Sequence, residues 1–184
     1  MTNNPDAPGL KIARSHGIST IGLNRKSFGS LMDFKTAIYD EIMKISPDII
    51  LLAGFMQIIE KGFVEKTYGK LINIHPSLLP DLPGLDTHQR AIEAKLKNHG
   101  CTVHFVDPGV DTGPIIAQAS LKIASDENHE ELAKRVLALE HNIYPWVVDQ
   151  VSLGKIRLEG RKVVYSPDCI AEAAKLNFSL PQGV

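Results

Sequence analysis

The stretch Asp48-Ile49-Ile50-Leu51-Leu52-Ala53-Gly54 is a continuous apolar run that ends in a glycine. Such a run is typical of a parallel strand that is buried on both faces. Two more short apolar runs, KLINIH (70–75) and CTVHFV (101–106), follow it, with helical patterns between the three. Because strands that alternate with helices indicate an α/β protein, we expect a mostly parallel central sheet flanked by helices.

The remaining elements follow from the same periodicities. Further strands are predicted at 19–23 and 114–123, and helices at 30–45, 63–69, 88–98 and 126–150. Thr87 fits the N-cap of the third helix, which is predicted to close at Gly100, and Pro145 is predicted to interrupt the fourth. The runs KIRLEG and RKVVYS (155–166) predict a C-terminal hairpin that turns near Glu159 and Gly160.

Composition narrows the class of protein. The 184 residues fit one domain. Their 20 Lys and Arg against 21 Asp and Glu give a net charge of -1, which argues against a nucleic-acid-binding face. No apolar run approaches the ~20 residues of a membrane helix, and residues 1–10 do not resemble a signal peptide. With two isolated cysteines, Cys101 and Cys169, we expect a cytoplasmic protein, monomeric or homodimeric, with no membrane or nucleic-acid partner.

Asn73 and His75 are the first candidate functional pair. Alternate residues of a strand share a face, so the two side chains should point the same way. They stand at the C-terminal end of a presumed parallel strand, where open α/β sheets bind ligands. An amide beside an imidazole can donate hydrogen bonds to a developing oxyanion. The alternative is a polar strand end whose hydrogen bonds are satisfied within the protein.

The turn-rich run Asp107-Pro108-Gly109-Val110-Asp111-Thr112-Gly113 supplies the second candidate. Its two carboxylates could orient a histidine, bind a metal or cap turns. An Asp beside His75 would favour the protonated ring, which could then act as a general acid. His104 could line a pocket or be a half-buried, hydrogen-bonded residue. The seven histidines show no metal-ligand spacing, so no metal is expected.

Four ordered segments carry a family resemblance: AGFMQII (53–59), NIHPSLLPDLPGLDTH (73–88), GCTVHFVDPGVDTGPII (100–116) and LEHNIYP (139–145). Together they resemble the glycinamide ribonucleotide formyltransferases. The resemblance implies a Rossmann-like formyltransferase fold. It also implies transfer of the formyl group of 10-formyltetrahydrofolate, as co-substrate, to the amine of glycinamide ribonucleotide in de novo purine synthesis, without a metal.

The resemblance also implies roles for individual residues. Asn73 and protonated His75 would stabilise the tetrahedral oxyanion, and Asp111 would hold His75 and help to move a proton. The folate-binding residues would be Met56, Gln57, Ile58, Ile59, Val64, Asp107 and Val110, and the substrate-binding residues Pro76, His104 and Glu140. Core packing is the alternative role for the apolar members of this set, and a solvated helix charge is the alternative for Glu140.

The chain also departs from the family pattern. Members normally begin with a strand, a Gly-rich loop that binds the substrate phosphate, and a helix, and none of these precedes Thr2 here. Leu31 and Gln57 stand where arginines are usual. We therefore expect the functional protein to start upstream of Met1. A formyltetrahydrofolate hydrolase-like enzyme and a catalytically silent folate-binding module are the alternative functions.

Overall fold

The computed structural model describes residues 1–55 and 57–181. Contacts divide the chain into two compact units, Met1–Asp48 and Ile49–Val184. The single domain expected from the length stays a prediction. No helix of the described residues is long and apolar enough to cross a membrane.

The first unit is helical. It contains α1 (Pro8–Ser15), the short 3-10 helix η1 (Arg25–Ser27) and α2 (Leu31–Ile45). The predicted helix at 30–45 is confirmed, with the Ser30 hydroxyl accepting a hydrogen bond from the Asp33 N–H as its N-cap. The predicted strand at 19–23 is wrong, because this segment makes only an isolated bridge, between Thr2 and Gly22, and so has no ladder of backbone partners among the described residues.

The second unit is built on a four-stranded sheet. Its strands are β1 (Ile50–Leu52), β2 (Leu71–His75), β3 (Asn98–Phe105) and β4 (Ile115–Lys122), in the order β1-β2-β3-β4. β1 and β2 are parallel and are connected through α3 (Lys61–Lys66), whereas the β2–β3 and β3–β4 pairings are antiparallel. The α/β class is confirmed, but this sheet is mixed and not mostly parallel. The β3–β4 connection is too short for the crossover that parallel strands need.

Two further predictions differ from the structure, one about β1 and one about Gly100. β1 is an edge strand of this sheet, and Leu51 is 45% exposed, so β1 is not buried on both faces as its apolar run predicted. Gly100 does not end a helix but lies within β3, because α4 (Thr87–Glu93) ends early. A Cβ at Gly100 would lie 2.0 Å from the Ala119 carbonyl oxygen, so the close approach of β4 requires the glycine.

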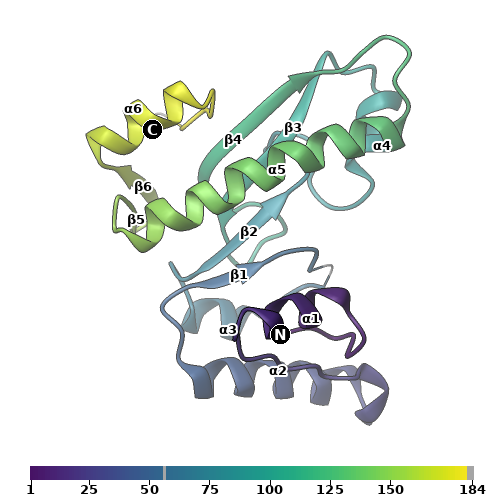
Figure 1. Ribbon diagram of the computed structural model, residues 1–184, viewed down its shortest axis with the longest axis vertical. Helices are drawn as coiled ribbons and strands as arrows, with labels where there is room; N and C mark the ends of the chain where they lie inside the picture. The colour runs from purple at the N-terminus through teal and green to yellow at the C-terminus, as the bar shows by residue number, and fades with distance from the viewer. Residues whose placement is uncertain (56, 182–184) are drawn as a thin grey trace. The chain divides into compact units, whose positions relative to one another are not determined.

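Helix α5 (His129–Ser152) forms the second layer and runs along β3 and β4 (Figure 1). It begins with a capping box between Asn128 and Glu131, not at Asp126. It also continues through Pro145, where an interruption was predicted. Apolar residues on both sides of the proline, Ile143 and Val147 among them, are fully buried, and this packing outweighs the lost backbone hydrogen bond.

The C-terminal elements complete the second unit. The predicted hairpin is confirmed as β5 (Ile156–Glu159) paired with β6 (Lys162–Tyr165). Helix α6 (Pro167–Lys175), which the sequence analysis did not predict, follows. Its N-cap is Ser166, with Pro167 in the first turn, which is a standard signal for the start of a helix. The apolar pattern of α6 is short and therefore predicts a helix only weakly.

Candidate active site

A cavity of about 600 Å³ opens at the C-terminal end of β2, within the second unit. Its walls come from β2, from the segments around 54–59 and 84–88, and from the loop 106–113. This volume is in the range of small-molecule pockets. Its position at the C-terminal end of β2 is the place where α/β proteins commonly bind ligands.

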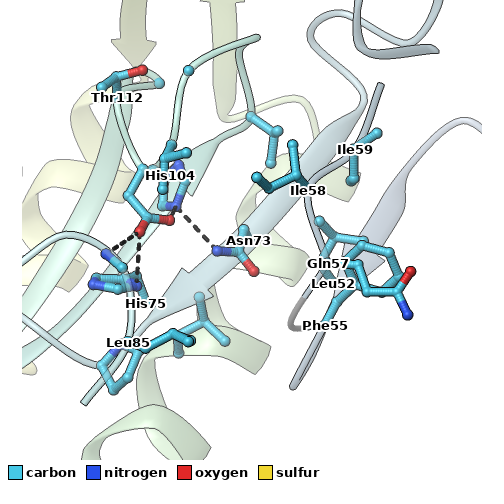
Figure 2. A pocket seen from close by; sticks show the side chains of 18 of the residues that line it. Leu52, Phe55, Gln57, Ile58, Ile59, Asn73, His75, Leu85, His104 and Thr112 are labelled. Carbon is cyan, nitrogen blue, oxygen red and sulfur yellow. Dashed lines mark hydrogen bonds and ion pairs between the residues drawn. The ribbon is translucent and has the colours of Figure 1, made fainter. Parts of the chain in front are cut away.

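Asn73 and His75 both line this cavity, as their spacing on one strand predicted. In Figure 2 the two side chains lie on the same side of β2, with His104 opposite them on the neighbouring strand. His75 is only 5% exposed and Asn73 is half-buried. A polar pair held in this way is sheltered from bulk water, which strengthens any hydrogen bond it makes.

Asp111, on the loop between β3 and β4, contacts His75 of this pair. Its Oδ2 lies 3.4 Å from His75 Nδ1 and accepts a hydrogen bond of 2.9 Å from the Gly84 N–H. The other ring nitrogen of His75, Nε2, lies 2.9 Å from the Leu82 carbonyl oxygen. Both ring nitrogens thus face acceptors, an arrangement that suits the doubly protonated ring. The pairing of His75 with an aspartate, which the residues alone left open, is present.

His104 orients Asn73. Its Nδ1 donates to the Phe105 carbonyl oxygen at 2.9 Å, which leaves Nε2 as an acceptor 3.2 Å from Asn73 Nδ2. Burial lowers the pKa of His104, against smaller opposite effects of the Phe105 carbonyl and Asp111, so the ring is neutral. A neutral ring in this tautomer directs the Asn73 amide nitrogen toward itself. His104 therefore both lines the cavity and makes buried hydrogen bonds, so both of its predicted roles are present at once.

The Asp107 carboxylate accepts several hydrogen bonds within the loop that carries Asp111. Its Oδ1 accepts hydrogen bonds from the Gly109 N–H at 3.1 Å and the Thr112 hydroxyl at 2.7 Å, and its Oδ2 accepts one from Arg161 at 3.0 Å. Burial raises the pKa of Asp107, but the hydrogen bonds from Thr112, Arg161 and Gly109 together lower it below its ordinary value. The carboxylate is thus ionised and engaged within the protein.

Six of the seven residues expected to bind folate line the cavity, and four of the six are apolar. In Figure 2 Gln57 lies beside Leu52 and Phe55, away from His75, whereas Ile58 lies nearer to Asn73. Val64 and Val110 also line the cavity, and Gln57 Oε1 is buried with no hydrogen-bond partner among the described residues. Met56, expected in the same set, lies outside the described residues.

The residues expected to bind the amine substrate are not all brought together. Pro76 and His104 line the cavity. Glu140 lies on α5 and is half-buried, and it is not among the described residues that form the cavity wall. Burial raises the pKa of Glu140, against a smaller lowering effect of His141.

Two backbone groups of the site were not singled out in the sequence analysis. The Gly84 N–H and the Leu82 carbonyl hold Asp111 and His75, and both belong to the proline-rich run 80–85. Leu82 has a φ of 53° and Gly84 a φ of 82°, so this run turns back sharply toward β2. The repeated prolines and the glycine were the available signal, because they mark a tight loop after a strand. Within residues 1–55 and 57–181, no three His, Cys, Asp or Glu side chains are grouped so that they could hold a metal ion.

The family description "Formyl transferase" matches residues 1–148. Over 157 residues the chain is 40% identical to the phosphoribosylglycinamide formyltransferase of Escherichia coli (strain K12), a match that covers 85% of this chain and 74% of that protein. The phosphoribosylglycinamide formyltransferase of Haemophilus influenzae is 41% identical over 159 residues, covering 86% of this chain and 75% of that protein.

Solved structures agree with these relatives. The phosphoribosylglycinamide formyltransferase of Coxiella burnetii superposes with a TM-score of 0.81 at 42% identity, covering 89% of this chain and 77% of that one. Glycinamide ribonucleotide transformylase 1 of Symbiobacterium toebii gives a TM-score of 0.81 at 37% identity, with the same coverage. The chain belongs to the formyl transferase family and, within it, to the phosphoribosylglycinamide formyltransferases.

Proposed function

We propose that the protein transfers the formyl group of 10-formyltetrahydrofolate to the primary amine of glycinamide ribonucleotide, a step of purine biosynthesis. The observation that carries this proposal is the convergence of Asn73, His75 and Asp111 on one cavity at the end of β2. The proposal is also supported by the relatives at about 40% identity, which are phosphoribosylglycinamide formyltransferases. The proposal also places the protein in the cytoplasm as a monomer or homodimer, which cell fractionation and light scattering test.

The proposed reaction needs no covalent enzyme intermediate. The neutral amine of the ribonucleotide attacks the formyl carbon, a new carbon–nitrogen bond forms, and the carbonyl oxygen becomes an oxyanion. The bond between that carbon and the folate N10 then breaks, and the proton lost by the amine passes to N10. Asn73 and His75 donate hydrogen bonds to the oxyanion, and Asp111 holds His75 and relays the proton through water.

The ligand-free geometry adds one requirement to this scheme. His75 Nε2 lies 2.9 Å from the Leu82 carbonyl oxygen, so this ring nitrogen already has an acceptor. A substrate oxygen must replace that carbonyl before Nε2 can donate to it. Catalytic hydrogen bonds of this kind often form only in the substrate complex. The loop that contains Leu82 therefore moves away from the ring during turnover in this proposal.

The two ends of the cavity take the two substrates in this proposal. The pterin of the folate lies against Gln57, Ile58, Ile59 and Val64, with Asp107 and Val110 at the same subsite, and Met56, which lies outside the described residues, stays a prediction. The amine substrate lies beside Pro76 and His104. Glu140 stays a prediction for the ribonucleotide, since it lies outside the wall of the cavity.

One assay tests the function against its alternatives. The protein is incubated with 10-formyltetrahydrofolate, with and without glycinamide ribonucleotide, and the release of tetrahydrofolate is followed. We expect release only with the ribonucleotide. Release without it would show a hydrolase, and binding of the folate without release in either case would show a catalytically silent module.

The pairing of His75 with Asp111 in catalysis is tested with Asp111→Asn, His75→Ala and the double variant. Each single variant should lower kcat by roughly 10²–10³-fold, the cost of losing one oxyanion-stabilising group. The double variant should be little worse than either, because residues that act as a unit are not additive. Asp126→Asn, an exposed aspartate outside the cavity, is the matched control. Losses that simply multiply would show that His75 and Asp111 act independently.

A further inference from the structure

The turn of the C-terminal hairpin contacts the loop that carries Asp111. Arg161, in the turn between β5 and β6, donates from Nη2 to Asp107 Oδ2 at 3.0 Å and to the Thr112 carbonyl oxygen at 3.3 Å. On its other side the turn is held by Tyr68, whose hydroxyl donates to the Gly160 carbonyl oxygen at 3.0 Å. The turn is therefore connected both to the chain that follows α3 and to the catalytic loop.

The contact with Arg161 is made at the point that organises this loop. The Asp107 carboxylate accepts the Gly109 N–H and the Thr112 hydroxyl on one oxygen and Arg161 on the other. The residues 107–112 are thus folded around one anion, which is 7% exposed. A buried carboxylate of this kind needs a cation, and among the described residues Arg161 is the cation that the structure pairs with it.

Asp111 is sensitive to the shape of this loop. It has a φ of 55°, a left-handed backbone conformation that costs energy for a residue with a Cβ and persists only when its surroundings hold it. Its carboxylate lies 3.4 Å from His75 Nδ1, so a small change in the loop alters that contact directly. Displacements of about 1 Å in a catalytic group can change rates greatly.

We propose that Arg161 is a positioning residue for formyl transfer: by pairing with Asp107 and the Thr112 carbonyl, it holds the loop in the shape that keeps Asp111 against His75. The inference rests on the proposed function. It assigns a role in the active site to the C-terminal hairpin, which contributes no residue to the wall of the cavity among the described residues. It also gives Asp107 a structural role beside its proposed contact with folate.

Arg161→Gln tests the proposal, with Arg157→Gln as the matched control. Arg157 lies on the same hairpin, and its partners among the described residues are Glu159, at 3.9 Å, and the Gly154 carbonyl oxygen. Arg161→Gln removes the cation that pairs with the buried Asp107 carboxylate, so the midpoint of urea unfolding should fall, and kcat is therefore compared under conditions in which each variant is fully folded. We expect Arg161→Gln to lower kcat about 3- to 10-fold with little change in KM, and Arg161→Lys to restore part of the loss.

A double-mutant cycle separates positioning from a general structural effect. In the Asp111→Asn background there is no carboxylate left to position, so Arg161→Gln should change kcat less than about 2-fold. An equal fold-loss in both backgrounds would overturn the proposal, because Arg161 would then act by another route. A kcat for Arg161→Gln equal to that of the Arg157→Gln control would overturn it as well.

Hydrogen exchange supplies a readout that does not depend on activity. In the ligand-free protein, the amides of 107–113 should exchange about 3- to 10-fold faster in Arg161→Gln than in Arg157→Gln, since the loop opens more often. Equal exchange would overturn the proposal. If the unaltered protein transfers no formyl group to glycinamide ribonucleotide, the proposed function is wrong, and exchange alone decides whether Arg161 orders the loop.

Discussion

Thr102→Val should destabilise the protein through one buried hydroxyl. Thr102 on β3 is fully buried, and its Oγ1 takes part in three hydrogen bonds. It donates to the Ser77 carbonyl oxygen at 2.6 Å and accepts from the Leu79 N–H at 3.0 Å and from Gln118 Nε2 at 2.9 Å. The hydroxyl thus connects the loop after β2 to β3 and β4.

The magnitude follows from the groups that valine would leave without a partner. Valine has nearly the same shape as threonine but cannot bond to the Ser77 carbonyl or the Leu79 N–H. Gln118 Nε2 keeps its second bond, 2.8 Å to the Leu79 carbonyl oxygen. Each buried backbone group left unpaired costs about 1–3 kcal/mol, and the added methyl group returns up to about 1 kcal/mol. We therefore expect the free energy of unfolding to fall by about 3 kcal/mol.

Urea unfolding followed by tryptophan fluorescence measures this difference, and Thr102→Ser is the matched control. Serine keeps the hydroxyl and loses one methyl group, so it should cost only about 1 kcal/mol. The loop that Thr102 holds leads to Gly84, whose N–H bonds to Asp111, so Thr102→Val should also lower kcat more than Thr102→Ser. If valine proves as stable as serine at this position, the hydrogen-bond argument is refuted.

Three further outcomes are expected. Burial lowers the pKa of His99 from 6.5 to about 4, with smaller effects from nearby histidines. Since the unfolded chain binds this proton first, the free energy of unfolding should fall by about 3 kcal/mol as the pH decreases from 6.5 to 4, and His99→Gln should flatten that slope in urea titrations. Gly113→Ala would place a Cβ 1.8 Å from the Phe105 carbonyl oxygen, so it should cost more than 2 kcal/mol in the same measurement; a neutral result would contradict the close approach. A folate analogue should bind the apolar part of the cavity with a Kd that hardly changes with ionic strength in calorimetry, and a steep dependence would argue against that subsite.

The hydrophobic periodicity of the sequence predicted the helices and strands whose pattern extends over many residues or whose apolar residues follow one another directly. The helix at 30–45, the strands β2 to β4 and the C-terminal hairpin were predicted close to where they occur. The failures have tertiary causes. A glycine after a helical pattern predicts a helix end at Gly100, but here the approach of the opposite strand requires the glycine. A proline predicts an interruption at Pro145, because local rules do not include the burial of its neighbours on the sheet.

The site was predictable only in part. The spacing of Asn73 and His75 placed them on one face of one strand without any further information, and the structure confirms it. The contact between His75 and Asp111 could not be predicted from spacing, because the distance between the two side chains depends on how an irregular loop folds. Gly and Pro patterns predict that a turn exists but not where its carboxylates point. The family resemblance, not spacing, supplied Asp111.

The two aspartates of this loop show what a pattern cannot separate. Asp107 and Asp111 stand four residues apart in the same turn-rich run, and sequence reasoning assigned turn capping, metal binding and orientation of a histidine to them alike. In the structure they are distinguished by long-range partners: Arg161, 54 residues away along the chain, for Asp107, and His75 for Asp111. An arginine in a hairpin turn gives no periodic signal, because an exposed charge fits any turn. The difference between a carboxylate that pairs with a distant arginine and one that lies against His75 is therefore visible only in the folded chain.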